Sequence, residues 1–232
     1  MKATAFLLMI GLSFSGQAQE TETLLYNMAT SGLYLRSQSK SQSRVITKIP
    51  YGSKIKVVEL TGVKGKSGWI EDEWLKVEFR GRTGYVFAGY LSEMRAPEKK
   101  KTSGKLTESL QLFTQHAFVA EKQAVETIEA DLLHCYQPFS GEVEFETETQ
   151  NGLTSASLTF PSKDIFDAFI LLEAILYWND ELSKLDSLRF VKGQDGKITK
   201  ITDSEGLVRI SMVSAEQVQL SLSDSHPRSV AN

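Results

Sequence analysis

Two adjacent residues, His134 and Cys135, have the side chains of a nucleophile and its base, because a catalytic thiolate needs a group that takes its proton. No Gly or Pro interrupts the segment from Leu106 to Tyr136, and its apolar residues recur at helical spacing, so we expect one helix there. Consecutive side chains of a helix point about 100° apart, so His134 would not reach Cys135. Cys135 would also lie at the C-terminal end, where the helix dipole opposes a thiolate. Both arguments favour an unreactive thiol.

Four glutamates alternate along the next segment, at Glu142, Glu144, Glu146 and Glu148. Alternate residues of a strand share a face and lie about 6.6 Å apart, a separation compatible with the carboxyl pair of an inverting glycosidase or with a cation site. A catalytic carboxyl, however, needs a cleft that raises its pKa. Glutamates at alternate positions of a strand are equally explained by a strand face that is exposed to solvent, which is the interpretation we adopt.

Other catalytic and metal-binding patterns are missing from the sequence. His116, His134 and His226 lack a zinc-ligand spacing, and the single cysteine allows no intramolecular disulfide. There is no Gly-rich phosphate loop and no Gly-x-Ser-x-Gly. We therefore expect no catalytic residue, no metal and no cofactor. A cell-wall hydrolase or peptidase with its active site in residues 106–232 remains the alternative.

Charge divides the 232-residue chain into parts of opposite sign. Residues 20–94 carry 11 basic and 8 acidic side chains, residues 95–105 carry 5 and 1, and residues 106–232 carry 9 and 20. Such asymmetry is typical of separate modules. Without a broad basic surface, a nucleic-acid partner is excluded.

The N-terminus has the order of a secretory signal peptide. Met1-Lys2 is followed by an apolar run to Phe14 and by small residues at Gly16-Gln17-Ala18, which predicts a signal peptide over residues 1–18. The apolar segment from Ile165 to Trp178 contains two acidic residues and is shorter than the roughly 20 residues that a membrane helix needs. We expect an exported protein, periplasmic or secreted, with no transmembrane anchor.

Five short segments after the signal peptide show strand patterns, with turn residues at Pro50–Ser53 and Arg80–Thr83. They are Leu33–Arg36, Ile46–Ile49, Ile55–Leu60, Trp74–Phe79 and Gly84–Phe87. Five strands in about seventy residues, with no helical period, predict a small all-β barrel that closes on itself to protect its edges.

Five sequence motifs within these strands occur in the order seen in one family. They are Leu33-Tyr34-Leu35-Arg36-Ser37, Ile49-Pro50-Tyr51-Gly52-Ser53, Trp74-Leu75-Lys76-Val77, Gly81-Arg82-Thr83-Gly84-Tyr85-Val86 and Tyr90-Leu91. With them, residues 24–92 resemble the bacterial SH3 domain. The resemblance implies an SH3-like barrel without catalytic residues that binds peptidoglycan, a cell-wall peptide or another envelope protein. The chain departs from the family at Gln38-Ser39 and in a long loop over Gly62–Glu73.

Five side chains are candidates for the ligand groove of this barrel. The resemblance places Trp74 and Tyr90 in the groove, strand alternation turns Tyr34 and Arg36 outward, and Trp69 lies in the polar loop. Arginine binds carboxylates, and the aromatic side chains offer flat apolar area. We expect Trp69→Ala to weaken binding by about 1–3 kcal/mol with little loss of stability. The same aromatic residues could instead be half-buried packing residues without a role in binding.

The remaining sequence predicts an exposed linker and a second domain. Residues 93–105 contain Pro97, three lysines and Gly104, a composition typical of a linker, so residues 20–94 are expected to fold alone. Residues 106–232 predict an α+β domain with helices packed on an antiparallel sheet. Its second helix is expected to begin at the N-cap Ser162, with Asp164 in the first turn. Its strands are expected at Glu142–Glu148, Leu153–Phe160, Leu188–Val191, Ile198–Ile201, Leu207–Val213 and Val218–Leu222.

Together these patterns predict a multidomain, exported, non-catalytic protein of the cell envelope. Its SH3-like module would bind a peptidoglycan-related ligand or a peptide or protein partner. A purely protein-binding adaptor in the periplasm is a further possibility. We find no internal sequence repeat and no family resemblance in residues 106–232.

Overall fold

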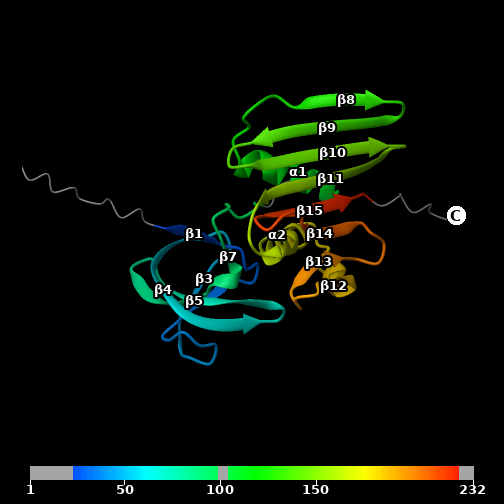
Figure 1. Ribbon diagram of the computed structural model, residues 1–232. Helices are drawn as coiled ribbons and strands as arrows, with labels where there is room; N and C mark the ends of the chain where they lie inside the picture. Colours follow the sequence, from blue (N-terminus) through cyan, green and yellow to red (C-terminus); the bar gives the residue numbers. More distant parts are fainter. Residues whose placement is uncertain (1–22, 99–103, 225–232) are drawn as a thin grey trace, which may run out of the picture.

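Two antiparallel sheets, one of seven strands and one of eight, account for most of the structure (Figure 1). The computed structural model describes residues 23–98 and 104–224. The predicted signal peptide over residues 1–18 and His226 lie outside these residues. Export therefore stays a prediction.

The N-terminal sheet curls into a small barrel, as the sequence predicts. Its strands are β1 (Leu24–Asn27), β2 (Leu33–Arg36), β3 (Val45–Ile49), β4 (Lys54–Ser67), β5 (Ile70–Phe79), β6 (Arg82–Phe87) and β7 (Leu91–Ser92), in the order β3-β2-β6-β5-β4-β1-β7. A short 3-10 helix, η1 (Ala88–Tyr90), precedes β7. Alternate residues fill the barrel, among them Leu33, Leu35, Leu75, Val77 and Val86.

The loop predicted over Gly62–Glu73 is instead the end of a long hairpin. β4 and β5 continue to Ser67 and Ile70, which pair across the two-residue turn Gly68-Trp69. Gly68 has φ +60°, the conformation that such a hairpin turn requires at its first position. Cross-strand pairing therefore carries the hairpin beyond the barrel, with Trp69 at its tip.

A buried asparagine holds the start of the barrel together. Asn27 has no exposed surface, and its Nδ2 donates to the carbonyl oxygens of Ile49 and Pro50, each at 3.0 Å. Its Oδ1 accepts from the backbone N–H of Ala29 at 3.0 Å. A buried amide is tolerated because its polar atoms have these partners.

The C-terminal part repeats one arrangement, a helix followed by four strands. The first unit is α1 (Leu106–Ala117) with β8 (Val125–Glu129), β9 (Leu132–Phe139), β10 (Val143–Gln150) and β11 (Leu153–Pro161). The second is α2 (Ile165–Trp178) and η2 (Leu182–Ser187) with β12 (Arg189–Lys192), β13 (Ile198–Thr202), β14 (Val208–Met212) and β15 (Gln217–Ser223). The last strands of the two units, β11 and β15, pair at the centre of the order β12-β13-β14-β15-β11-β10-β9-β8. This part is thus mainly strand, with its two α-helices packed on one sheet.

The prediction of one helix from Leu106 to Tyr136 is wrong. The helix ends at Ala117, and the remainder forms the hairpin of β8 and β9, with Ala130 in a left-handed turn at φ +55°. Val125, Ile128 and Leu132 do have helical spacing, but Val125, Thr127 and Ile128 are β-branched, which favours a strand. Pairing of β9 with β10 decides for strand.

The cap of the second helix also differs from the prediction. The N-cap is Asp164, whose Oδ1 accepts from the backbone N–H of Phe166 at 3.0 Å. Ser162 lies two residues earlier, where its Oγ accepts from the backbone N–H of Asp164 and donates to Oδ2 of Asp167 at 2.6 Å. Ser162 thus supports the cap and positions Asp167 without being the cap itself.

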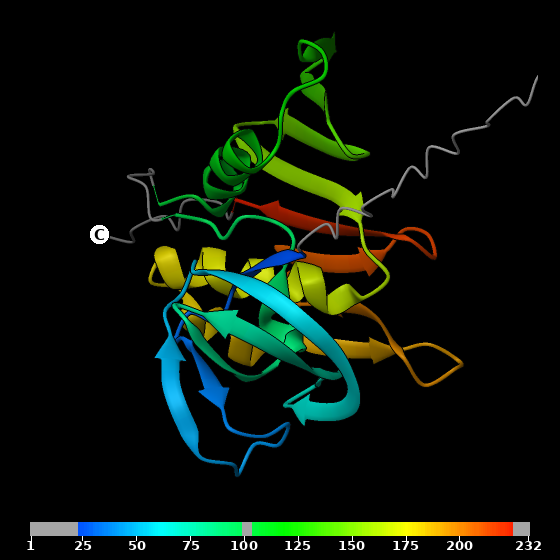
Figure 2. The same cartoon turned by 90° about the vertical axis from the view of Figure 1, so that its left-hand side faces the viewer.

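The helix α2 lies between the barrel and the eight-stranded sheet, and it packs on both (Figures 1 and 2). One hydrophobic cluster joins Met28, Ile70, Trp74 and Phe87 of the barrel with the apolar residues of α2 and of the second sheet. A helix that is apolar around most of its circumference needs cover on every side, and Ile165–Trp178 has that composition. None of the described helices is long and apolar enough to cross a membrane.

Part of the predicted linker is packed against this shared core. Ala96 is buried, and the carbonyl oxygen of Pro97 accepts from Tyr51 Oη at 2.8 Å and from Trp178 Nε1 at 3.2 Å. Residues 93–98 are therefore held between the two parts of the molecule. That residues 20–94 fold alone stays a prediction, which limited proteolysis with a protected fragment ending near Met94–Lys105 would support.

Candidate functional site

The five predicted ligand-binding residues lie on the barrel's outer surface, but in three different environments. Tyr34 and Arg36 belong to β2, Trp74 to β5 and Tyr90 to η1, while Trp69 forms the hairpin tip. The structure brings Trp74 and Tyr90 into one aromatic cluster and Tyr34 and Arg36 into another.

The cluster around Trp74 is covered by the second part of the molecule. Trp74 is only 7 % exposed and packs edge-on against Phe87, with ring centroids 6.1 Å apart. Tyr90 packs on the other side of Phe87, and its hydroxyl lies 3.1 Å from that of Ser67. The Trp74 ring also lies so close to Gly65 that a Cβ there would come within 2.6 Å of its Nε1. These aromatic residues pack against one another and belong to the core shared with α2.

Trp69 reaches across to the second sheet. Its ring stacks on Phe190 of β12, with centroids 5.2 Å apart and planes inclined by 22°, and Phe190 in turn contacts Phe169 of α2. Trp69 is nevertheless 54 % exposed, so one face of the ring is open to solvent. The expected weakening of binding by Trp69→Ala stays a prediction, and the stacking adds an expected loss of stability.

The opposite end of α2 is also held by the barrel. Trp178 packs edge-on against Tyr51 at 5.6 Å, and burial raises the pKa of Tyr51 to about 12. Nearer the middle of the helix, Thr30 Oγ1 donates to Glu173 Oε1 at 3.4 Å, and burial raises the pKa of that carboxyl. The helix α2 thus packs on the barrel along its length, and of the five residues assigned to a ligand, Trp74 and Tyr90 belong to the core that it shares with the barrel.

The cluster around Tyr34 is open. The Tyr34 ring is flanked by two cations, with Arg36 Cζ at 5.3 Å and Lys48 Nζ at 5.6 Å from its centroid, and the residue is 45 % exposed. Tyr34 and Lys48 face each other across β2 and β3. Two cations beside one accessible aromatic ring can hold a carboxylate while the ring packs on the ligand's apolar atoms.

The loop after β2 holds Arg36 in place. Arg36 Nη1 donates to the carbonyl oxygen of Ser43 at 2.8 Å. Ser43 is buried, and its Oγ donates to the carbonyl oxygens of Gln38 and Lys40 at 3.0 and 2.9 Å. The guanidinium is therefore oriented before any ligand arrives, which lowers the entropic cost of binding. Lys48 is the residue of this cluster that the sequence interpretation missed, although its cross-strand position opposite Tyr34 could have indicated it.

Cys135 lies in strand β9, not at a helix end as predicted. Its pKa is raised by burial and by the Glu126 carboxylate, while a hydrogen bond with Thr147 lowers it. His134 is its neighbour in the strand and so points to the opposite face. Burial, the Glu126 charge and the position of His134 therefore disfavour a reactive thiolate. The arguments from helix geometry and the helix dipole do not apply, because Cys135 is not in a helix.

We expect Cys135→Ser to leave any binding or hydrolytic activity unchanged, because the thiol is partly buried, its pKa is raised, and His134 points to the opposite face of the strand. Wall binding and fragment release, measured side by side for the parent and the variant, check this. A hydrolysis that depends on the thiol and disappears in Cys135→Ser would contradict it.

Three of the four alternating glutamates share the sheet face that no helix covers. Glu144, Glu146 and Glu148 alternate along β10, and Tyr136 Oη donates to Glu144 Oε1 at 3.0 Å. Glu142 is not on this strand, contrary to the prediction, but in the turn before it at φ +58°. Among the residues that the structure describes, no group of three His, Cys, Asp or Glu side chains could hold a metal ion.

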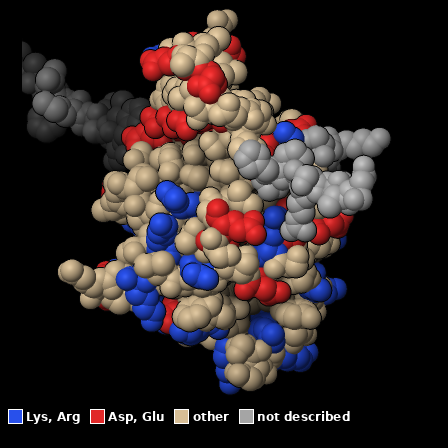
Figure 3. Space-filling model, turned by 90° about the vertical axis from the view of Figure 1, so that its right-hand side faces the viewer, with Lys and Arg blue, Asp and Glu red and all other residues tan. Residues whose placement is uncertain are grey.

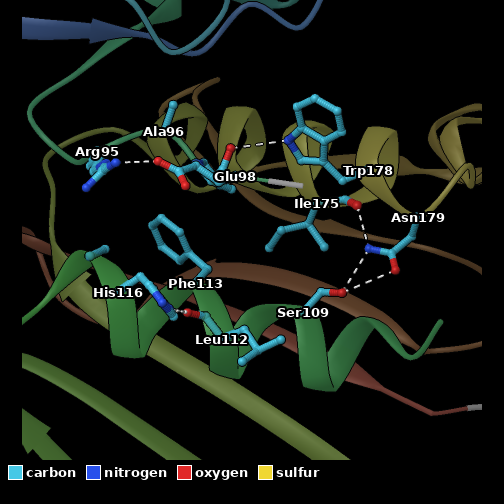
Figure 4. Close-up of a pocket in the computed structure, with 12 residues that line it drawn as sticks. Arg95, Ala96, Glu98, Ser109, Leu112, Phe113, His116, Ile175, Trp178 and Asn179 are labelled. Atoms are coloured by element: carbon cyan, nitrogen blue, oxygen red, sulfur yellow. Dashed lines mark hydrogen bonds and ion pairs between the residues drawn. The ribbon is translucent and has the colours of Figure 1, made fainter. Parts of the chain in front are cut away.

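A small cavity lies between α1, α2 and residues 95–98 (Figure 4). Phe113 and Ile175 form its apolar wall, and Asn179 Nδ2 donates to Ser109 Oγ at 3.0 Å on its polar side. His116 lines it too, with Nδ1 within hydrogen-bond distance of the Leu112 carbonyl oxygen. Its volume of about 70 Å³ is well below that of a typical substrate pocket.

Comparison with known proteins gives a match for the barrel and for no other part of the chain. No curated protein and no solved structure matches the chain. Residues 31–92 match the family model described as the bacterial SH3 domain, which confirms the resemblance for this segment. Bacterial SH3 domains often bind cell-wall components, so this match suggests a role in binding the cell wall or peptidoglycan.

Proposed function

We propose that this protein is an exported, non-catalytic protein of the cell envelope, periplasmic or secreted, whose SH3-like barrel binds a carboxylate-bearing peptide of the cell wall. The observation that carries the proposal is the open cluster of Tyr34, Arg36 and Lys48 on a barrel that matches the bacterial SH3 family. A peptide or protein partner with an exposed carboxylate would offer the same chemistry.

The cluster suits a carboxylate for two reasons. Arg36 is permanently charged, is oriented by Ser43 and can still form further hydrogen bonds through its planar guanidinium. Lys48 adds a second positive charge beside the Tyr34 ring. A terminal carboxylate bound there would place its neighbouring methyl groups against an exposed aromatic face.

We place the ligand at Tyr34 and not at Trp74, because binding at Trp74 would require α2 to leave the barrel. Opening the shared core would expose Met28, Ile70 and Phe87 to water. Each such side chain contributes about 1.5–3 kcal/mol by its burial, so opening would consume much of the binding free energy.

We expect Arg36→Gln and Tyr34→Ala each to weaken retention on purified peptidoglycan about tenfold, because a central charged or aromatic contact contributes about 1–3 kcal/mol. The measurement is co-sedimentation of the mature protein with purified walls at increasing wall concentration. Lys54→Gln is the matched control, because Lys54 lies over the ring of another tyrosine of the barrel, the partly buried Tyr26, at 6.0 Å. Equal retention of all three variants would contradict the proposed site.

The alternative functions are tested in the same incubation. A wall hydrolase with its site in residues 106–232 would release soluble fragments, whereas a non-catalytic binder would pellet with the walls and release none. An adaptor would show neither retention nor release and would instead co-purify with a protein partner.

A further inference from the structure

One end of the eight-stranded sheet projects beyond both helices. This part, which we call the wing, comprises residues 119–150 with strands β8, β9 and β10, and it forms the upper end of the molecule in Figure 1. The contacts of α1 and α2 with the sheet centre on β11 and β13 to β15. Within the wing Phe139, Val143 and Phe145 are buried, whereas every residue of β8 is exposed. β8 is the terminal strand of the sheet.

The edge of the wing is exposed along its whole length. Every residue from Val119 to Asp131 is exposed, including three large apolar ones, Val119, Val125 and Ile128, of which Ile128 is 75 % exposed. Ile128 faces Leu133 across the strands, and Leu133 is exposed as well. Exposed apolar side chains on an unpaired edge are typical of a strand that pairs with another chain.

The backbone of β8 offers hydrogen-bonding groups on its outer side. Glu129 and Leu132 pair across a two-residue turn, so the pairs bonded to β9 are those of Val125, Thr127 and Glu129. The N–H and C=O groups of Glu126 and Ile128 therefore point away from the sheet. The opposite edge strand, β12, is different, because the Trp69 ring from the barrel stacks on its Phe190.

The charge of the wing indicates which kind of partner could bind to it. The wing carries eight acidic side chains and one lysine, and Figure 3 shows acidic residues gathered at the projecting end of the molecule. On one face of β8, Glu126 lies next to Ile128, and on the other face Thr127 separates Val125 from Glu129, so each face carries one acidic and one apolar residue. A second copy of this chain would bring two strongly acidic wings together, which like-charge repulsion opposes.

We propose that β8 binds an extended, lysine- or arginine-rich segment of a partner protein, which joins the sheet as a ninth strand. Its basic side chains would pair with Glu126 and Glu129, and its apolar side chains would cover Val125 and Ile128. Main-chain hydrogen bonds to Glu126 and Ile128 would give affinity, and the side-chain pairs would give specificity. This surface lies in the second part of the molecule and is independent of the site proposed on the barrel.

The test uses a fluorescein-labelled, capped nine-residue peptide in which two consecutive lysines alternate with a valine and a threonine, so that both faces of the added strand carry basic and β-branched side chains. The peptide is added to the mature full-length chain. Fluorescence anisotropy should show binding that weakens severalfold between low and physiological salt, because exposed charges are screened. Hydrogen exchange should show new protection of the amides of Glu126 and Ile128. A peptide of equal charge with two central prolines, which cannot complete a strand, should bind at least about tenfold more weakly.

Two matched variants locate the surface. Ile128→Lys should raise the Kd for the lysine peptide about tenfold, because it removes an apolar contact and adds a like charge on the edge. Val191→Lys makes the same change at the exposed Val191 of the opposite edge strand β12 and should change the Kd less than about twofold. Thermal unfolding of both variants checks that they remain folded.

Three results would overturn the proposal. The first is equal binding of the proline-containing peptide, which would indicate charge attraction alone. The second is an equal effect of Ile128→Lys and Val191→Lys, or no new amide protection in β8. The third is a dimer in sedimentation velocity that Ile128→Lys converts to monomer, which would assign the edge to a second copy of the chain.

Discussion

Trp74→Ala should lower the free energy of unfolding by about 3–5 kcal/mol, the cost of removing a large aromatic side chain from a well-packed core. Trp74 is 7 % exposed and belongs to the hydrophobic cluster that the barrel shares with α2 and the second sheet. Its loss leaves a cavity beside Phe87, and Gly65 has no side chain with which to fill it. Urea denaturation followed by circular dichroism measures the change.

Tyr34→Ala is the control for this prediction, because Tyr34 is an aromatic residue of the same barrel that is 45 % exposed. It should lower the free energy of unfolding by less than about 1 kcal/mol. A loss of less than about 1 kcal/mol for Trp74→Ala would show that Trp74 is not part of a shared core. Trp74 would then again be a candidate for binding a ligand in the barrel groove, as the sequence predicts.

Asp167→Asn should stabilise the protein by about 1–3 kcal/mol at pH 7 and have little effect at pH 4. Burial, against the hydrogen bond from Ser162 and together with the charges of Asp164, Asp72 and Glu93, raises the pKa of Asp167 to about 6. Asp72 is a barrel residue whose pKa is also raised by burial, so the acidic groups of both parts of the molecule meet here.

The direction of this pH dependence follows from which state, folded or unfolded, binds the proton of Asp167 more tightly. Well below the ordinary aspartate pKa of 3.8, the carboxyl of Asp167 is protonated in both the folded and the unfolded chain and contributes nothing to the difference in stability between the protein and the variant. As the pH rises from about 4 to about 6, the unfolded chain ionises first, so the folded state loses stability, and the loss is complete above the folded pKa of about 6. Asparagine carries no charge and escapes this loss.

Urea denaturation at pH values from 4 to 8 measures the effect. Glu148→Gln, at an exposed residue of the open sheet face, is the matched control and should follow the pH dependence of the parent. A constant difference between Asp167→Asn and the parent across this range would contradict the prediction. It would mean that the substitution acts through packing or the Ser162 hydrogen bond and not through ionisation.

Most strands were predictable from local patterns. Leu33–Arg36 was expected as a strand and is β2 with those bounds, because apolar and polar residues alternate there over a half-buried strand. Asn151-Gly152 was expected to join two strands and does so between β10 and β11, with both residues at positive φ. Such features depend on residues within a few positions of one another.

The segment after α1 shows where local patterns are ambiguous. Val125, Ile128 and Leu132 fit one face of a helix, while the β-branched side chains of Val125, Thr127 and Ile128 also suit a strand. The outcome depends on β10, which pairs with β9 and thereby draws the segment into the sheet. The strand position of Cys135 follows from that pairing, so the reason for its low reactivity could not be derived from the sequence.

The sequence by itself determined the barrel, its resemblance to the bacterial SH3 family and the outward position of Tyr34 and Arg36, because strand alternation and turn chemistry are local. Only the tertiary structure decided that Trp74 and Tyr90 pack in a core shared with α2, that Trp69 stacks on Phe190, and that Lys48 joins Tyr34. The apolar residues around most of Ile165–Trp178 indicated a helix that is covered on all sides. They did not indicate that the barrel and the eight-stranded sheet provide this cover. An aromatic side chain of the barrel can pack equally well against a ligand or against another part of the chain, so which surface it meets depends on contacts between residues about a hundred positions apart.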